Sequence, residues 1–259
     1  TFRNSWKNDC LQMVVKAGPP AYWHNQPDNG TFEIWYNGKP LFQDSGAYVY
    51  GGGEEIMRWR NWFRRTASHN TLTFSDRNIE KMDSKTLLWQ PEGEVQILVT
   101  ENQSYTYMSH RRSIFFVDGR YFVIVDEGTG RADGWVNLHY QMPPGKTIGT
   151  REDMHFHTEM TDGCNMKLQC FGPKDLGMKM EEGWVSSDIK LKRKRINANF
   201  HARKAGDKPV RFITVIVPKE EPGDEPSISA SFIDGYSANS MKLEVKVGKE
   251  KKRILGYPL

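Results

Sequence analysis

The sequence has no long apolar run and no recognisable leader, and both shortages limit what the protein can be. No stretch of the 259 residues approaches the roughly 20 apolar residues that a membrane-spanning helix needs. No charged-then-apolar leader follows Thr1, so we expect a mature protein or a piece of a longer one. Hydrophobic residues make up 37% of the chain and aromatic residues 12%, which favours a globular fold over disorder.

Cysteine is also scarce, and its count limits the disulfides that can form. Three cysteines cannot all pair within one chain. Cys164 and Cys170 would lie ~20 Å apart on one extended strand, which is too far for a disulfide. We therefore predict three free thiols, a state that fits either an oxidising or a reducing compartment.

Helical periodicity is confined to a turn or two at residues 54–63, and no repeat of fixed period argues for a propeller or solenoid. Asn37-Gly38 and Asp118-Gly119 each separate two β-rich runs, the pattern of a tight hairpin. The sequence therefore predicts an all-β chain, a large antiparallel β-sandwich with less than about a tenth helix. The strongest β-branched and aromatic runs span residues 94–100, 113–128, 136–142, 211–218 and 241–248.

The acidic, proline-rich segment KEEPGDEP at residues 219–226 is the best linker in the chain. A long surface loop before the last strands explains it equally well. We therefore treat residues 1–259 as one domain.

The net charge of +4 is mild, but the positive side chains are clustered. One cluster is KLKRKR at residues 190–195, and the other consists of Arg58, Arg60, Arg64 and Arg65. Such clusters suit a polyanion, namely nucleic acid, an anionic membrane surface or an acidic polysaccharide, although a solvated strand face also explains the run at 190–195. No nucleic-acid-binding motif and no membrane span accompany them, so we expect neither partner.

The turn-forming stretch YWHNQPDNG at residues 22–30 contains His24 and Gln26 in addition to the Asn, Pro, Asp and Gly that a turn requires. His24 and Gln26 are two apart, so their side chains leave the same face of an extended segment. Asp44 follows one strand signal, and His69 precedes another. An imidazole, a carboxylate and an amide oxygen can together bind zinc or calcium. Ordinary turn hydrogen bonding explains the same residues, and the spacing alone does not decide.

Other histidines have simpler explanations. His139 lies on an alternating strand run, VNLHYQM, where a packed or hydrogen-bonded sheet residue is the expected role. His155 and His157 form an HxH pair without a third partner, which is a weak metal signal.

Residues 23–74 resemble the metal-binding and catalytic segment of the heparinase II/III-like polysaccharide lyases. Gln26 stands where related enzymes carry a second histidine, which makes the resemblance closest to the heparinase III type, the heparan sulfate lyases. The matching stretches are HNQPDNG, FEIWYNGKPLFQDSGAYVY, MRWRNWFRRT and HNTL, and later HRRSIFFVDGRYFVIVDEG and VNLHYQ.

The resemblance implies a site and a substrate. It makes His24 a catalytic residue, and it places a structural divalent metal ion, calcium or zinc, at Gln26, Asp44 and His69. The implied substrate is heparan sulfate or a related acidic polysaccharide, cleaved by β-elimination at uronic acid residues. The planar guanidinium group of arginine can donate two parallel hydrogen bonds to a sulfate or carboxylate group. The expected substrate-binding residues are Arg58, Arg60, Asn70 and Tyr48.

The resemblance also implies a partner domain, because such lyases carry an N-terminal α/α toroid that supplies a catalytic tyrosine and a uronate-neutralising asparagine or histidine. No toroid helices are present here. We therefore expect the C-terminal β-sandwich of a periplasmic bacterial enzyme, inactive without its toroid. The alternative is a non-catalytic binding module that holds acidic glycans with its basic strips and with tryptophans such as Trp59 and Trp62.

Overall fold

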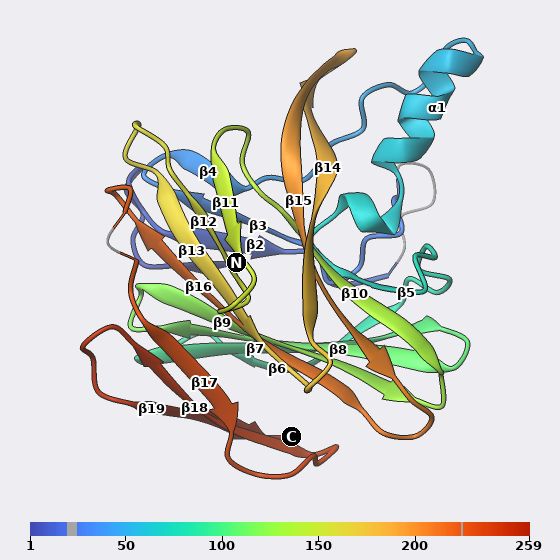
Figure 1. Cartoon of the computed structure of the whole chain (residues 1–259). Helices are drawn as coiled ribbons and strands as arrows, with labels where there is room; N and C mark the ends of the chain where they lie inside the picture. The colour runs from blue at the N-terminus through green and yellow to red at the C-terminus, as the bar shows by residue number, and fades with distance from the viewer. Residues whose placement is uncertain (20–24, 224) are drawn as a thin grey trace.

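The computed structural model describes residues 1–19, 25–223 and 225–259, and these ranges form an almost entirely antiparallel β structure (Figure 1). Helix α1 (Glu54–Phe63) and the 3₁₀ helix η1 (Thr66–Ser68) contribute only ten and three residues, so the predicted low helix content is confirmed. The strands are β1 (Phe2–Arg3), β2 (Gln12–Val15), β3 (Phe32–Tyr36), β4 (Lys39–Phe42), β5 (Leu72–Phe74), β6 (Ser84–Gln90), β7 (Val95–Tyr105), β8 (Met108–Val117), β9 (Tyr121–Gly130), β10 (Gly134–Gln141), β11 (Thr147–Thr150), β12 (His155–Thr158), β13 (Asn165–Phe171), β14 (Gly177–Asp188), β15 (Leu191–Lys204), β16 (Val210–Lys219), β17 (Ile228–Phe232), β18 (Ser240–Val247) and β19 (Arg253–Pro258).

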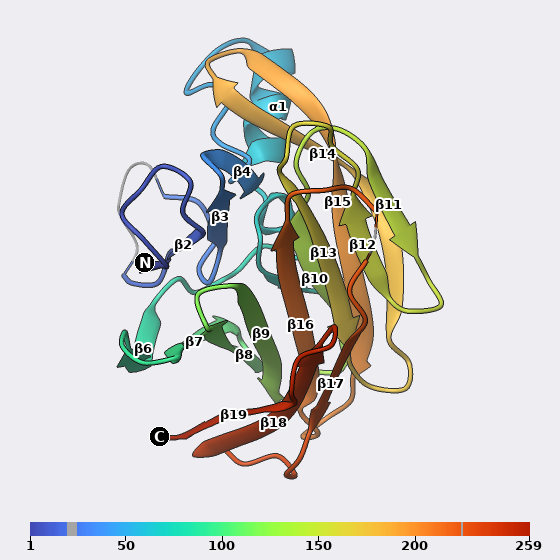
Figure 2. The same cartoon turned by 90° about the vertical axis from the view of Figure 1, so that its left-hand side faces the viewer.

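The strands are arranged in layers around one large sheet. This sheet has eight strands in the order β11-β12-β13-β16-β9-β8-β7-β6. Two four-stranded sheets, β1-β2-β3-β4 and β14-β15-β10-β5, cover one face, and the three-stranded sheet β17-β18-β19 covers the other (Figure 2). The predicted antiparallel β-sandwich is confirmed, with a third layer added by the last strands.

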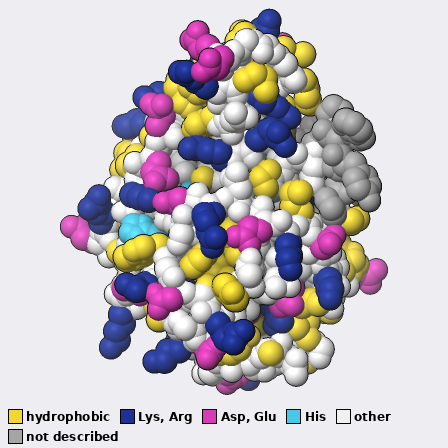
Figure 3. All heavy atoms as spheres, turned by 90° about the vertical axis from the view of Figure 1, so that its right-hand side faces the viewer, with side chains coloured by type: hydrophobic (Ala, Val, Ile, Leu, Met, Phe, Trp, Pro, Cys, Tyr) yellow, Lys and Arg dark blue, Asp and Glu magenta, His cyan; other side chains and the backbone are white. Residues whose placement is uncertain are grey.

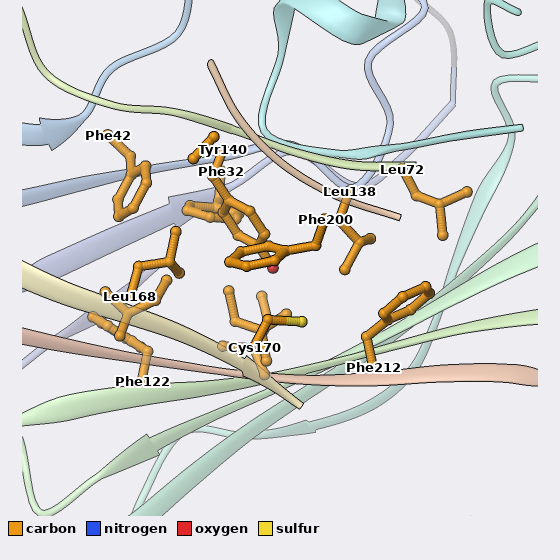
Figure 4. Close-up of a cluster of buried hydrophobic side chains, with 14 of the residues drawn as sticks. Phe32, Phe42, Leu72, Phe122, Leu138, Tyr140, Leu168, Cys170, Phe200 and Phe212 are labelled. Carbon is orange, nitrogen blue, oxygen red and sulfur yellow. The ribbon is translucent and has the colours of Figure 1, made fainter. Parts of the chain in front are cut away.

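The central strands of the large sheet are apolar on both faces. In β9, Phe122 and Ile124 enter the core beneath the four-stranded sheets, whereas Val123 and Val125 enter the core beneath β17–β19. The first core is a dense group of aromatic and aliphatic side chains (Figure 4). A sheet that is covered on both faces needs apolar residues at consecutive positions, which explains the unbroken hydrophobic runs in β8 and β9.

Both predicted hairpins are present. Asn37 and Gly38, with φ of 50° and 72°, join β3 to β4, and Asp118 and Gly119, with φ of 51° and 67°, join β8 to β9. Two consecutive residues at positive φ define the turn whose twist matches that of paired strands, and Asn-Gly or Asp-Gly reaches it at low cost.

Strand β10 separates the core from a polar outer face. Leu138 and Tyr140 point into the core, and the alternating His139 and Gln141 point outward yet are only 2% and 1% exposed. The His139 ring contacts the Thr73 hydroxyl at 2.9 Å, so this histidine is the hydrogen-bonded sheet residue that the alternation predicts.

The β14–β15 hairpin projects past the sandwich (Figure 1). Side chains of α1 contact this hairpin. Trp59 of α1 meets Trp184 edge to face at 5.3 Å, and the Lys192 ammonium lies 3.9 Å from the Trp59 ring centre. The residues of the basic run at 190–195 therefore lie in two environments. The first ones are at the hairpin tip, whereas Arg195 is only 2% exposed and is hydrogen-bonded inside the protein. On the face of the molecule that lies on the right in Figure 1, lysine and arginine side chains are interspersed with acidic ones (Figure 3).

Cys10, Cys164 and Cys170 are free, as predicted, and all three are buried. Across the described ranges, no helix combines the length and apolar character needed to cross a membrane.

The burial of His139 predicts a pH-dependent stability. Burial lowers the pKa of His139 to about 3, against about 6.5 in an unfolded chain. The unfolded chain therefore binds the proton more readily, so the neutral ring stabilises the fold fully above pH 6.5. This stabilisation is lost as the pH falls from 6.5 towards 3, by up to about 1.4 kcal/mol per pH unit. Urea unfolding from pH 7.5 to 5 measures the slope.

His139→Gln should reduce this slope, even though it also lowers stability at every pH. Asn137→Ala on the same strand is the matched control, because it removes a buried polar group that does not titrate. Equal slopes for the wild type and His139→Gln would contradict the prediction.

Candidate functional site

The turn at residues 25–30 is closed by local backbone hydrogen bonds and fits closely against neighbouring side chains. The Asp28 N–H donates to the Gln26 carbonyl at 2.9 Å, and the Thr31 N–H donates to the Asp28 carbonyl at 2.9 Å. Gly30 has φ of 80°, and a Cβ there would lie 3.4 Å from the Thr71 hydroxyl and 3.5 Å from the His110 ring. Glycine therefore supplies the left-handed turn, which other residues adopt only with strain.

Asp44 and His69 meet beside this turn. Asp44 follows β4, and its Oδ1 accepts the Gly46 N–H at 2.8 Å. His69 ends η1, and its side chain is fully buried. The His69 Nδ1 and Asp44 Oδ2 atoms are 2.6 Å apart. Two segments that are 25 residues apart in the chain thus share one short polar contact.

Asp28 is the third member of the group. The ligand atoms of Asp28, Asp44 and His69 all lie within 4.8 Å of one another. In the part of the chain that the structure describes, no other cluster of three or more His, Cys, Asp or Glu is so close, which leaves the His155 and His157 pair without a third ligand. Asp28 also forms an ion pair with Lys16.

Two buried atoms lack a hydrogen-bond partner within the described residues: His69 Nε2 of the cluster, and Gln26 Oε1 of the adjoining turn. The Gln26 amide nitrogen approaches the Gly46 carbonyl at 3.4 Å, which leaves the oxygen as the unused atom. A buried polar atom without a partner costs about 1–3 kcal/mol. The two carboxylates and the imidazole are a donor set that fits calcium or zinc, and the Gln26 amide oxygen, two residues before Asp28 in the chain, is a candidate fourth ligand.

Burial and charge act against each other in this cluster. Burial alone would raise the pKa of Asp44, but the adjacent His69 and the Gly46 N–H hold it below its usual value. Burial alone would lower the pKa of His69, but the Asp44 carboxylate holds it above its usual value. Arg195 adds positive charge nearby, and it donates to the Gln43 carbonyl and the Ser45 hydroxyl at 2.7 Å each.

A buried ion pair connects the turn to the His69 segment. Arg112 of β8 is 1% exposed and donates to both carboxylate oxygens of Asp126 on β9, at 2.7 and 3.2 Å. The other terminal nitrogen of Arg112 donates to the Gly30 carbonyl and, at 2.7 Å, to the Asn70 carbonyl. One guanidinium thus fixes both loops of the candidate site to the central sheet.

The remaining residues of the predicted site lie in different surroundings. Arg58 is exposed and pairs with Glu54 at 2.9 Å, whereas Arg60 is 7% exposed and donates to the Ala47 carbonyl at 3.1 Å. Asn70 is fully buried, and its amide joins the Phe32 carbonyl to the Gln141 N–H. Tyr48 has φ of 61° and stacks on Phe63 at 5.5 Å. The proposed catalytic residue, His24, lies outside the described residues.

Sequence reasoning missed the contributions of Asp28 and Arg112. Asp28 is part of the quoted turn, but only the fold brings its carboxylate to Asp44 and His69. Arg112 shares its strand face with Ile114 and Phe116, both buried in the first core. The alternation along β8 therefore contained the signal that Arg112 points inward.

Comparisons with known proteins agree on one family. The sequence model of the family "Heparinase II/III-like, C-terminal" matches residues 2–231. A protein of Bacteroides stercoris named heparin-sulfate lyase is 55% identical over all 259 residues, and one of Pedobacter heparinus with the same name is 30% identical over 98% of this chain. This chain spans 39% of the length of each of these relatives.

Solved structures agree with the sequence relatives. The structure of the Heparinase III-BT4657 gene product superposes over the whole chain with a TM-score of 0.97 at 55% identity, and this chain covers 40% of it. Heparan sulfate lyase HepC from Pedobacter heparinus gives a TM-score of 0.94 at 30% identity, again over the whole chain and 41% of that structure.

The role of Asp126 in holding the loops can be tested by removing its charge. Asp126→Asn leaves the buried Arg112 without a counter-charge, so we expect the free energy of unfolding to fall by about 3–5 kcal/mol. Urea denaturation at pH 7 measures the loss. Glu54→Gln, which breaks the exposed pair with Arg58, should change stability by less than about 0.5 kcal/mol. Comparable small effects for the two variants would exclude the proposed anchoring role.

Proposed function

Because this chain belongs to the heparinase II/III-like family as a C-terminal domain, we propose that it is the β-sandwich part of a polysaccharide lyase that cleaves heparan sulfate or a related acidic polysaccharide. The chief support is the coincidence of two findings. Relatives over 98–100% of this chain are named heparin-sulfate lyases, and Asp28, Asp44 and His69, from three of the stretches that carry the family resemblance, lie in one polar cluster.

β-Elimination at a uronic acid residue sets the chemical requirements. The C5 proton is removed, the C4–oxygen bond breaks with its electron pair leaving on oxygen, and a C4–C5 double bond forms. The leaving oxygen takes up a proton. The uronate carboxylate must be neutralised for C5 to become acidic, and a base and an acid must be within reach. His24 is the proposed base or base-assisting residue, because imidazole titrates near neutral pH.

We propose that Gln26, Asp28, Asp44 and His69 hold a structural divalent ion, calcium or zinc. When bound, such an ion crosslinks three chain segments and neutralises the two carboxylates. Asp44 orients the His69 ring, and Arg112 holds the Gly30 turn and the Asn70 backbone in register. His24 is two residues before Gln26, so the same anchoring would limit where its imidazole can lie.

The chain spans about two-fifths of its relatives' length, and we propose that the rest of the catalytic machinery lies in an N-terminal α/α toroid. We also propose the bacterial periplasm as the site of action, on the basis of the family relationship. The exposed guanidinium of Arg58 and the lysines of the β14–β15 tip are suited to bind the polyanion, and a purely binding role would use the same groups.

The lyase proposal is tested by following the absorbance of the unsaturated uronate on heparan sulfate. We expect activity from the enzyme that includes the toroid, none from this chain alone, and a loss of about a hundredfold or more for His24→Ala in the larger enzyme. His157→Ala, outside the cluster, is the matched control. Full activity of His24→Ala would refute its catalytic role, and binding without cleavage by the larger enzyme would favour the binding module.

The metal proposal is tested with Gln26→Leu. The Gln26 oxygen has no partner within the described residues, and its amide nitrogen makes only a long contact of 3.4 Å with the Gly46 carbonyl, so the substitution should change the melting temperature little after chelation. In calcium or zinc, the wild type should gain stability according to the ion's affinity, and the variant should gain less. Differential scanning calorimetry and metal analysis of dialysed protein measure both effects. Gln90→Leu, on the exposed edge strand β6, should respond to metal like the wild type. The absence of any metal-dependent stabilisation in the wild type would refute the proposal.

A further inference from the structure

A pocket of about 340 Å³ opens on the polar outer face of the sheet β14-β15-β10-β5, close to the end of α1. Trp62 and Arg65 form one wall, and His139, Gln141 and Asn197 form part of the base. Trp62 is held edge to face against Phe63 at 4.9 Å, and the Arg65 guanidinium carbon lies 5.0 Å from the Trp62 ring centre. An aromatic wall facing a small set of polar groups is the usual composition of a site for a small polar ligand.

The base of the pocket carries hydrogen-bond acceptors that the protein does not use. The Gln141 amide nitrogen donates to the Ala67 carbonyl at 3.0 Å, so its oxygen is the remaining atom. The Asn197 amide nitrogen donates to His139 Nδ1 and to the Glu181 carboxylate, at 3.0 Å each. Gln141 and Asn197 are 1% and 4% exposed, and neither oxygen has a partner among the described residues.

The orientation of these two amides follows from their neighbours. The Ala67 carbonyl and the Glu181 carboxylate can only accept a hydrogen bond, so each must face an amide nitrogen. Burial lowers the pKa of His139 to about 3, so its ring is neutral at pH 7 and Nδ1 can accept from Asn197. The two oxygens are therefore fixed in place, and a ligand with hydroxyl donors would satisfy them.

The charges around the pocket are already balanced. Glu181 pairs with Lys179 at 2.8 Å, and Glu182 pairs with Lys194 at 2.6 Å. Asp76 and Arg65 supply one further charge of each sign. An anionic ligand would have to displace a paired carboxylate, and a cationic one would face Arg65. The balance therefore favours an uncharged ligand.

From these observations we propose that this pocket is a subsite for one uncharged, hydroxyl-rich sugar ring. The apolar face of the ring packs on Trp62, and its hydroxyl groups donate to Gln141 Oε1, Asn197 Oδ1 and the Glu181 carboxylate. The inference rests on the proposed function to the extent that the ring belongs to the polysaccharide that the larger enzyme is proposed to cleave.

The pocket and the metal cluster share a rigid connection. The Gln141 side chain donates to the Ala67 carbonyl, two residues before His69, and the Gln141 backbone N–H donates to Asn70 Oδ1 at 2.7 Å. A glycan bound in the pocket would therefore have a fixed position relative to the segment that carries His69, on the side of that segment away from the core.

The test uses this chain and two sugars that differ in a single group, methyl β-glucoside and its uronate counterpart, methyl β-glucuronide. Saturation-transfer NMR titrations should detect the glucoside, and the glucuronide should bind at least about tenfold more weakly. Trp62→Ala should weaken glucoside binding about tenfold, the effect of uncovering roughly 50 Å² of apolar ring face. Trp135→Ala is the matched control, because Trp135 is an exposed tryptophan at the other end of the same sheet.

A second variant blocks the pocket base without removing any polar group. A Cβ on Gly183 would lie 3.0 Å from Gln141 Oε1, so Gly183→Ala places a methyl group over the unused oxygen. It should abolish detectable glucoside binding while the chain keeps its cooperative unfolding. No glucoside binding by the wild type, equal binding of the two sugars, or equal losses in Trp62→Ala and Trp135→Ala would overturn the proposal. The lyase assay is independent of this titration. If the larger enzyme cleaves heparan sulfate but the pocket binds no glucoside, the subsite is rejected and the proposed lyase function stands.

Discussion

The carboxylate of Asp126 is completely buried between the layers of the sandwich, and the candidate site depends on how its charge is met. Arg112 and His110 both contact it, and Arg112 also donates to the backbone carbonyls of Gly30 and Asn70 in the two loops. The Arg112 charge and the His110 hydrogen bond hold the pKa of Asp126 down to about 2 in spite of burial. A buried ion pair of this kind contributes little net stability compared with apolar packing, but it allows few alternative arrangements. Its value here is geometric, because two irregular segments acquire the rigidity of the central sheet.

The framework of the molecule and its loops are held in place by different kinds of side chain. Apolar side chains that alternate between two cores build the framework, and polar side chains that face inward place the loops. Arg195 repeats the device at the loop that carries Asp44, where burial lowers its pKa to about 9. Loops gain defined positions when buried side chains satisfy their backbone carbonyls.

The sequence predicted the framework better than the site, for physical reasons. Strand runs, the Asn37-Gly38 and Asp118-Gly119 turns and the helix at 54–63 are local patterns, and all are present. The residue types allowed Asp44 and His69 to share a metal site, but only the family resemblance favoured that site over ordinary turn hydrogen bonding. The burial of Arg195 was not expected, because its partner Ser45 lies 150 residues away, and a basic run in sequence gives no sign of which member turns inward. Contacts made by folding, rather than by neighbours in the chain, set these environments.

The third layer has a consequence for how the domain is delimited. The family match ends at residue 231, within β17, whereas β18 and β19 supply Leu243, Val245 and Leu255 to the second core. Tyr257 also meets the Ser113 hydroxyl at 2.7 Å in the middle of β8. A protein cut at the recognised boundary would present the apolar back of the largest sheet to water, a surface prone to association. The family model therefore covers less of the chain than the unit that buries both faces of the large sheet.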